Sequence, residues 1–172
     1  MGKSVKRLVV ASLLIALDVV FARFFAINLP PIVRLSFQFL PNALAATFFG
    51  PIYGAFIMVA GDIIGMLVNS AGQSFFWGFT ITAALKGFLY GLFFYKKSPG
   101  IIRTILGFTT VTVVCSLILN SFWYCVWTSS ITMPTYIATF SSKVPADVVS
   151  IIIYSSVYFF VLTALKRCKI KV

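Results

Sequence analysis

The sequence of 172 residues contains no histidine and only three acidic residues, and charged residues of both signs make up just 10% of it. A soluble domain of this length needs a charged surface, which so few residues cannot supply. With no histidine or glutamate, and three cysteines in no pairing or CxxC pattern, the sequence does not favour a metal site. It also offers no Ser-His, Cys-His or paired-carboxylate arrangement, so it predicts that the protein is not an enzyme.

What the sequence does contain is apolar surface: 60% of its residues are hydrophobic, 17% are aromatic, and the mean hydropathy is +1.04. A helix that crosses a bilayer needs about 20 mainly apolar residues, so the chain has room for roughly six. Its apolar runs, divided by Gly, Pro and basic turns, predict an all-α membrane protein with six transmembrane helices in a single domain, 1–172. The predicted spans lie at about 5–27, 40–49, 51–68, 78–95, 101–127 and 146–165.

The formal net charge of +11 is unevenly distributed over these predicted spans. With a cytoplasmic N-terminus, only Arg23, Arg34 and Lys143 lie in the outer segments. The cytoplasmic segments then hold Lys3, Lys6, Arg7, Lys96, Lys97, Arg103, Lys166, Arg167, Lys169 and Lys171. This asymmetry predicts that both termini are cytoplasmic. No basic run alternates with aromatic residues on a polar segment, so nucleic-acid binding is not predicted.

Three outer segments follow from this topology, at about 23–39, 69–77 and 128–145. They are long, polar and aromatic, whereas the inner connections are short. Long loops that are not disordered are often functional. These segments are therefore expected either to form the mouth of a binding site and its lid or to be unstructured outer loops.

Asp18, Asp62 and Lys86 lie near the middle of predicted spans. An ionised side chain at that depth costs several kcal/mol, on the order of 2.5–3.5 by insertion scales, unless it faces protein or water and finds a partner. Two readings remain open: a structural ion pair between Lys86 and one of the aspartates, or the polar floor of a substrate cavity.

Near the outer boundary, Arg23, Arg34 and Lys143 outnumber Asp147. Surplus cationic donors suit a ligand that carries carboxylates, which arginine can bind through two hydrogen bonds. Aromatic residues lie at the same level and could stack on a flat ring or form an interfacial belt. They are Phe37, Phe39, Phe75, Phe76, Trp77, Trp123, Tyr124 and Trp127.

Small residues recur every three or four positions in two predicted spans, which favours close packing of helices in lipid. They are Gly50, Gly54, Gly61 and Gly65 in one span and Thr80, Ala84, Gly87 and Gly91 in the next. Ser12 and Ala16 have the same spacing in the first span. Their face could pack against a neighbouring helix or dock a partner protein.

The sequence has no GxxxxGK[ST] loop, so this chain is not expected to bind ATP in that way. It also shows no inverted repeat of broken helices of the kind many self-sufficient transporters have. Six helices with a capped outer cavity and no energy source of their own indicate a binding subunit that takes energy from partners.

The run RLSFQFLPNALAATFFGPIYGAF (34–56) resembles the substrate-binding (S) subunits of energy-coupling-factor (ECF) transporters, and within them the folate group. The stretches GDIIGML (61–67) and FFWGFTITAALKGFLYGLFFYKK (75–97) fit the same group. The similarity covers about residues 10–97 well and the last two helices only loosely.

The resemblance implies a six-helix S-component bundle in a bacterial plasma membrane, with an outward-facing vitamin site under loops 1, 3 and 5. It also implies a complex with a transmembrane coupling subunit and two ATPase subunits, so that ATP is bound by the partners and no cofactor by this chain. Such S subunits are thought to topple in the membrane as they deliver the vitamin. An AxxxA motif on the family's first helix docks the coupling subunit, and Ser12 and Ala16 occupy it here.

Folate also fits the residues, because its pterin is flat and offers donors to an aspartate, while its glutamate carries two carboxylates. Two alternatives stay open: an S subunit for another small anionic vitamin such as pantothenate, and a membrane assembly or scaffold protein whose solid interior pairs Lys86 with Asp18 and Asp62. The candidate substrate-binding residues are Arg23, Arg34, Phe37, Gln38, Asp62, Phe75, Trp77, Lys86, Trp123 and Lys143.

Overall fold

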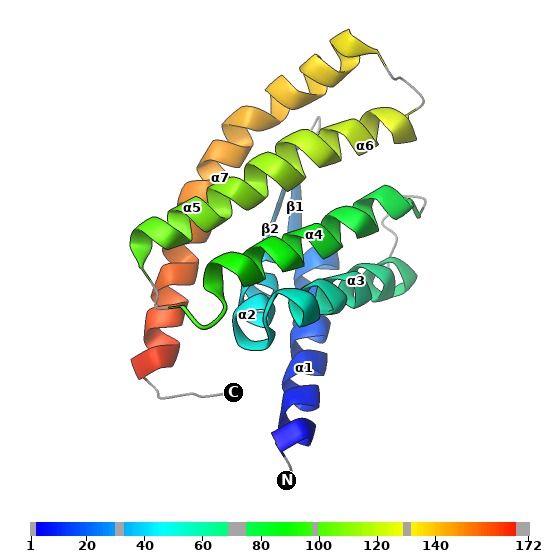
Figure 1. The fold of residues 1–172 in the computed structure, drawn as a ribbon. Coiled ribbons are helices and arrows are strands. Elements are labelled where there is room, and N and C mark those ends of the chain that lie inside the picture. The colour runs from blue at the N-terminus through cyan, green and yellow to red at the C-terminus, as the bar shows by residue number, and fades with distance from the viewer. Residues whose placement is uncertain (1–2, 30–32, 69–74, 98–99, 129–131, 168–172) are drawn as a thin grey trace.

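The computed structural model describes residues 3–29, 33–68, 75–97, 100–128 and 132–167, which form a helical bundle with one short hairpin (Figure 1). In chain order the elements are α1 (Lys3–Arg23), β1 (Ala26–Leu29), β2 (Val33–Ser36), α2 (Phe39–Phe49), α3 (Pro51–Val68), α4 (Trp77–Phe94), α5 (Ile101–Val111), η1 (Thr112–Leu119), α6 (Asn120–Trp127) and α7 (Met133–Arg167).

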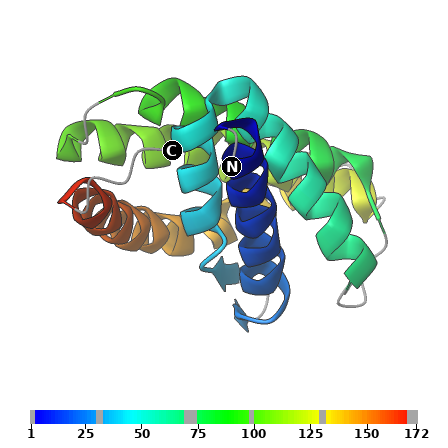
Figure 2. The same ribbon diagram turned by 90° about the horizontal axis from the view of Figure 1, so that it is seen from below.

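The break that Gly50-Pro51 predicts between the second and third spans is confirmed. α2 ends at Phe49 and α3 begins at Pro51. Gly50 joins them with φ +91°, a conformation that glycine adopts without the steric cost of a Cβ, and its N–H donates to the Ala46 carbonyl at 3.0 Å. α1 and α2 lie side by side (Figure 2).

In the described part of the chain, four helical segments are long and apolar enough to cross a membrane: 51–68, 77–94, 101–127 and 133–165. α5, η1 and α6 together form the third of these, with a π-helical stretch in its middle. α2 is apolar but has only 11 residues, and α1 carries basic residues at both ends and Asp18 between them. The count of six spans therefore stays a prediction.

The predicted helical class is confirmed, with one addition that the sequence did not predict. Part of the first outer segment forms a short antiparallel hairpin in which Ala26 pairs with Ser36 and Leu29 with Val33. Pairing satisfies backbone N–H and C=O groups that an irregular loop would leave to water.

One expectation from the sequence is wrong: 128–145 is predicted to be a polar outer segment before a span that begins near 146. Instead α7 begins at Met133 and contains Pro145. Hydroxyl groups in this polar stretch form hydrogen bonds within the helix. Thr139 Oγ1 donates to the Thr135 carbonyl and Ser142 Oγ to the Thr139 carbonyl, both at 2.9 Å. Polar side chains that bond to their own helix do not have to reach water.

The predicted close packing along small residues is confirmed between α3 and α4. A Cβ added at Gly87 would lie 2.7 Å from the Ala55 Cα, and one at Gly91 would overlap the Pro51 backbone. A Cβ at Gly54 of α3 would lie 2.9 Å from the Ala46 Cα of α2. The three helices therefore touch through their backbones, as small residues allow in membranes.

α5 and α7 are held by aromatic side chains instead. Phe108 is fully buried and contacts Phe39, Phe94 and Tyr158, with ring centroids 5.4–6.0 Å apart. The Tyr158 hydroxyl shares a hydrogen bond of 2.6 Å with Thr47. The wider cluster of buried residues includes side chains from α2, α3, α4, α5, η1 and α7.

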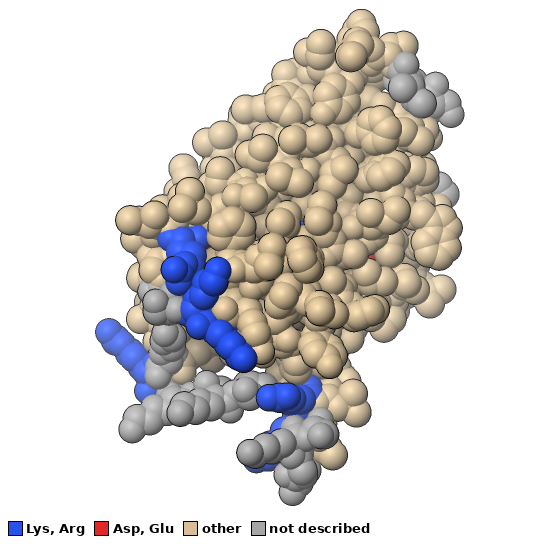
Figure 3. All heavy atoms as spheres, in the orientation of Figure 1, with Lys and Arg blue, Asp and Glu red and all other residues tan. Residues whose placement is uncertain are grey.

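The start of α1 and the end of α7 lie at the same end of the bundle (Figure 1). On the face seen in Figure 3, Lys and Arg side chains gather at that end, and the rest of the face is nearly free of charge. Large apolar side chains are exposed over the helices, among them Leu67 and Phe160. An exposed apolar belt above a basic end is the surface expected of a bundle in a bilayer.

Candidate substrate-binding site

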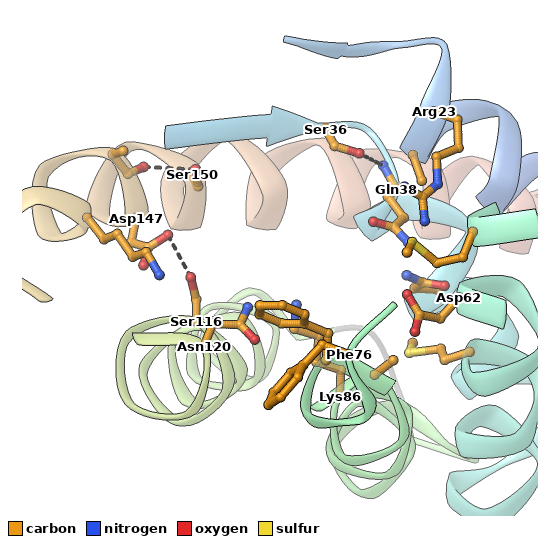
Figure 4. A pocket seen from close by; sticks show the side chains of 18 of the residues that line it. Arg23, Ser36, Gln38, Asp62, Phe76, Lys86, Ser116, Asn120, Asp147 and Ser150 are labelled. Carbon is orange, nitrogen blue, oxygen red and sulfur yellow. Dashed lines mark hydrogen bonds between the residues drawn. The ribbon is translucent and has the colours of Figure 1, made fainter. Parts of the chain in front are cut away.

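A cavity of about 360 Å³ lies between α1–α4 on one side and η1, α6 and α7 on the other. Arg23, Gln38 and Asp62 face it from the first side, Ser116, Asn120 and Asp147 from the second, and Phe76 and Lys86 lie between them (Figure 4). Ligand pockets are typically about 300–1,000 Å³. The complete lining is Ala22, Arg23, Ser36, Gln38, Asn42, Met58, Asp62, Met66, Phe75, Phe76, Phe79, Ala83, Lys86, Ser116, Asn120, Lys143, Ala146, Asp147 and Ser150.

The first wall consists of residues from α1 to α4. Asp62 Oδ2 accepts a hydrogen bond from Thr80 Oγ1 at 2.8 Å, which joins α3 to α4 beside the cavity. Ser36 Oγ donates to the Phe21 carbonyl at 3.2 Å and accepts from the Gln38 N–H at 3.1 Å. These bonds fix the start of α2 against the end of α1 and so place the Gln38 side chain.

The second wall consists of residues from η1, α6 and α7. Ser116 Oγ donates to Asp147 Oδ1 at 3.2 Å, so the π-helical stretch is bonded to α7 at the cavity (Figure 4). Asp147 Oδ2 and Asn120 Oδ1 are buried and have no hydrogen-bond partner among the described residues. A buried acceptor without a partner costs free energy, so these two oxygens are available to a ligand that donates.

Three cations reach the cavity from different helices: Arg23 from α1, Lys86 from α4 and Lys143 from α7. Within the described chain, no ion pair within 4 Å joins Lys86 to Asp18 or Asp62, and the Arg23 Nε is buried without an acceptor. Of the two sequence readings for Lys86, a polar cavity wall therefore agrees with the structure. Lys143 Nζ lies 5.9 Å from the centre of the Tyr124 ring.

The start of α4 supplies the aromatic part of the cavity. Phe75, Phe76 and Phe79 line it, and the Phe76 ring meets Trp123 edge to face at 5.8 Å. Trp77 is 68% exposed, outside the lining, and packs against Phe75.

Of the candidate residues from the sequence, six line the cavity: Arg23, Gln38, Asp62, Phe75, Lys86 and Lys143. Phe37 and Trp77 are exposed outside it, and Trp123 lies behind Phe76. Arg34 lies on β2 opposite Asn28, and its side chain is outside the described part of the structure.

Sequence reasoning did not select Asn42, Asn120 and Ser116, which all line the cavity. Their signal was an amide or hydroxyl within a predicted apolar span, which is costly in lipid unless it faces protein or water. In the described chain, no three His, Cys, Asp or Glu side chains lie close enough together to hold a metal ion.

A helical bundle with exposed apolar side chains and a polar, cationic cavity has the features of a membrane protein that binds a small molecule. Its family follows from comparison with known proteins. The chain belongs to the substrate-specific components of ECF transporters. The model of the family described as "ECF transporter, substrate-specific component" matches residues 6–165. These are transport components and not enzymes, as the sequence predicted.

Proteins named "Folate transporter FolT" are among those similar to this chain. The one from Clostridium novyi is 34% identical over 121 residues, which is 70% of this chain and 69% of the relative. The one from Leuconostoc mesenteroides is 25% identical over 159 residues, 91% of this chain and 84% of the relative.

A solved structure described as "Crystal structure of FolT bound with folic acid" has the same fold. It superposes with a TM-score of 0.79 at 32% identity and covers 92% of this chain and 91% of its own. The resemblance to the folate group of S subunits is thereby confirmed.

Proposed function

We propose that this chain is the folate-binding S subunit of a bacterial ECF transporter and that it holds the vitamin in the cavity between its two walls. The observation that carries the proposal is its likeness, over 92% of the chain, to FolT bound with folic acid. The chemistry of the cavity supports it, because three cations face two aspartates there. Cationic side chains suit the carboxylates of a glutamate group.

The remaining lining residues fit the pterin. A pterin is flat and offers N–H donors on one edge. Asp147 Oδ2 and Asn120 Oδ1 are acceptors without a partner among the described residues, and Phe76 and Phe79 supply ring faces and edges. A buried acceptor paired by the ligand recovers the free energy it costs in the empty protein.

The proposal includes the orientation and the partners. The cavity opens toward the outside under loops 1, 3 and 5, and the basic end that holds the start of α1 and the end of α7 lies in the cytoplasm. A transmembrane coupling subunit docks on the exposed face of α1 that carries Ser12 and Ala16, and two ATPase subunits bind the ATP; this chain takes no cofactor. The subunit topples to deliver the vitamin.

The experiment is a titration of the purified protein in detergent with folate, with a folate analogue that lacks the glutamate, and with pantothenate. Folate should bind most tightly. Arg23→Ala should weaken folate by tens of fold, since breaking a desolvated charge pair costs about 2–5 kcal/mol and each 1.4 kcal/mol is about tenfold. Arg34→Ala tests the second arginine of the sequence prediction in the same way.

The analogue without glutamate should bind the parent and Arg23→Ala about equally, because it lacks the group that the arginine meets. If both arginine variants bind folate like the parent, carboxylate capture by these residues is wrong. If the parent binds pantothenate and not folate, the protein is an S subunit for another vitamin. A scaffold protein would bind none of the three ligands.

A further inference from the structure

Asp18 is buried behind the cavity without lining it. It lies in α1, and its side chain is only 2% exposed. Its Oδ1 has no hydrogen-bond partner among the described residues. A buried carboxyl group with an unsatisfied oxygen costs folding free energy, so stability does not account for its presence. Costly buried groups of this kind are expected at functional sites.

The partners of Asp18 connect it to the cavity. The side-chain amides of Gln38 and Asn42 lie within reach of its carboxyl group, and both residues line the cavity. Gln38 is also fixed through its backbone, by the Ser36 hydroxyl that bonds to the end of α1. Asp18 is thus one layer behind two amides that a ligand would meet.

Space for the Asp18 side chain exists because residue 61 is glycine. A Cβ added at Gly61 would overlap Asp18 Oδ2, so α3 leaves room at this position for the carboxyl group. This contact also provides a way to displace the carboxyl group without changing Asp18 itself.

The geometry of an amide gives Asp18 a consequence for the ligand. An amide has two N–H donors on its nitrogen and one acceptor oxygen on the other side of the same plane. When the nitrogen donates to Asp18, the oxygen turns away from it. We propose that Asp18 is a positioning residue: it holds the amides of Gln38 and Asn42 with their oxygens toward the cavity and so selects a ligand ring that carries N–H donors.

This inference rests on the proposed binding of folate, whose pterin carries a 2-amino group next to a ring N–H. A site built to accept hydrogen bonds from a ligand rejects an analogue that lacks the donor, because its own acceptors are then left unpaired. Without Asp18 the two amides are free to turn over, and an amide nitrogen can face the ligand instead. The discrimination should then disappear even if some affinity remains.

The test measures the affinity of purified parent and Asp18→Asn protein for folate and for an analogue with hydrogen in place of the 2-amino group. The parent should bind folate at least tenfold more tightly than the analogue. Asp18→Asn should weaken folate at least tenfold, and its ratio between the two ligands should fall below about threefold, roughly 0.65 kcal/mol. A purely structural role would weaken both ligands by the same factor, and that result overturns the inference.

Gly61→Ala displaces the carboxyl group while keeping Asp18, and it should lower the ratio in the same way. Gly100→Ala is its matched control, because a Cβ there meets nothing within 4 Å, and it should keep the parent ratio. If Asp18→Asn does not fold, Gly61→Ala decides, and a parent-like ratio in that variant overturns the inference. If the parent binds neither ligand, the proposed function fails and the inference with it; if the parent binds folate but no variant changes the ratio, only the inference fails.

Discussion

The two halves of the bundle are built in different ways. In α1–α4 the helices touch through glycines, and the Asp62 carboxylate at the cavity has a donor in Thr80. In α5–α7 the helices pack through aromatic rings around Phe108, which also contacts Phe94 of α4. Among the described residues, buried polar atoms without a partner number four in the second half and two in the first.

This difference indicates a division of roles. Backbone contact at glycines tolerates no adjustment, so the first half is suited to be the rigid wall of the site. Aromatic packing combined with unpaired acceptors, on a helix with a π-helical segment, is suited to a wall that becomes complete when a ligand binds. π-Helical segments are frequent at functional sites. The following predictions test this division, from the largest expected effect to the smallest.

The glycine contact between α3 and α4 should be essential for folding. Gly87→Val places a side chain against the Gly54 and Ala55 backbone, where no flexible group can move aside. Overpacking costs about 1–3 kcal/mol or more, so the thermal unfolding midpoint in detergent should fall by roughly 5–10 °C, or no folded protein should be recovered. Gly100→Val, in open space, should match the parent, and equal stability of both variants would show that the contact can adjust.

Transport should depend on an exposed face of the first half that the second half does not provide. Ala16 is exposed on α1, and Ala164 is a matched exposed alanine on α7. Ala16→Trp should abolish folate uptake by cells that contain the whole transporter, while Ala164→Trp should retain it. Both isolated variants should bind folate within about twofold of the parent, since surface substitutions change free energies by about 0.5 kcal/mol or less. Loss of binding in Ala16→Trp would mean that this face is needed inside the subunit.

The first half was also easier to predict from the sequence than the second. Gly50-Pro51 and the glycines of α3 and α4 identified both a helix break and a packing face, because small residues and proline act through the backbone. The start of α7 could not be predicted in this way. Hydroxyl groups there, such as that of Thr139, bond back to their own helix, and the sequence does not show whether they do so or reach water.

The site was predictable in its charges and less so in its amides and aromatics. Arg23, Lys86 and Lys143 stand out because a cation in an apolar chain is costly unless it faces protein or water. Asn42 and Asn120 are neutral and short, so they gave a weaker signal. Which of Phe75, Phe76 and Trp77 faces inward depends on how α4 is rotated, and neighbouring helices determine that rotation.

The aromatic residues at the start of α4, where the two halves meet, give a third prediction. Phe76 lines the cavity and touches Trp123 of the second half, whereas Trp77 is exposed. Phe76→Ala should weaken folate binding by about 1–3 kcal/mol, as loss of an aromatic platform does for a base, which is roughly 5- to 150-fold. Trp77→Ala should stay within about twofold. A larger effect of Trp77 in the same titration would favour stacking of Trp77 on the pterin over a place in an interfacial belt.

The smallest effects are expected from one substitution on each wall of the cavity. The two substitutions should differ in how they change the stability of the ligand-free protein, so they separate the two walls most directly. Thr80→Val removes the donor to Asp62, so it should lower the stability of the ligand-free protein by about 1–3 kcal/mol. Asn120→Leu removes an oxygen that has no partner in the described chain, so it should leave that stability unchanged or raise it. If the ligand uses this oxygen, Asn120→Leu should nevertheless weaken folate binding by about 0.5–1.5 kcal/mol, roughly two- to tenfold.

Thermal unfolding without ligand and folate titration on the same samples measure both the stability and the affinity. A ligand-free protein destabilised by Asn120→Leu, or folate bound by it as by the parent, would show that the second wall is already complete without the ligand.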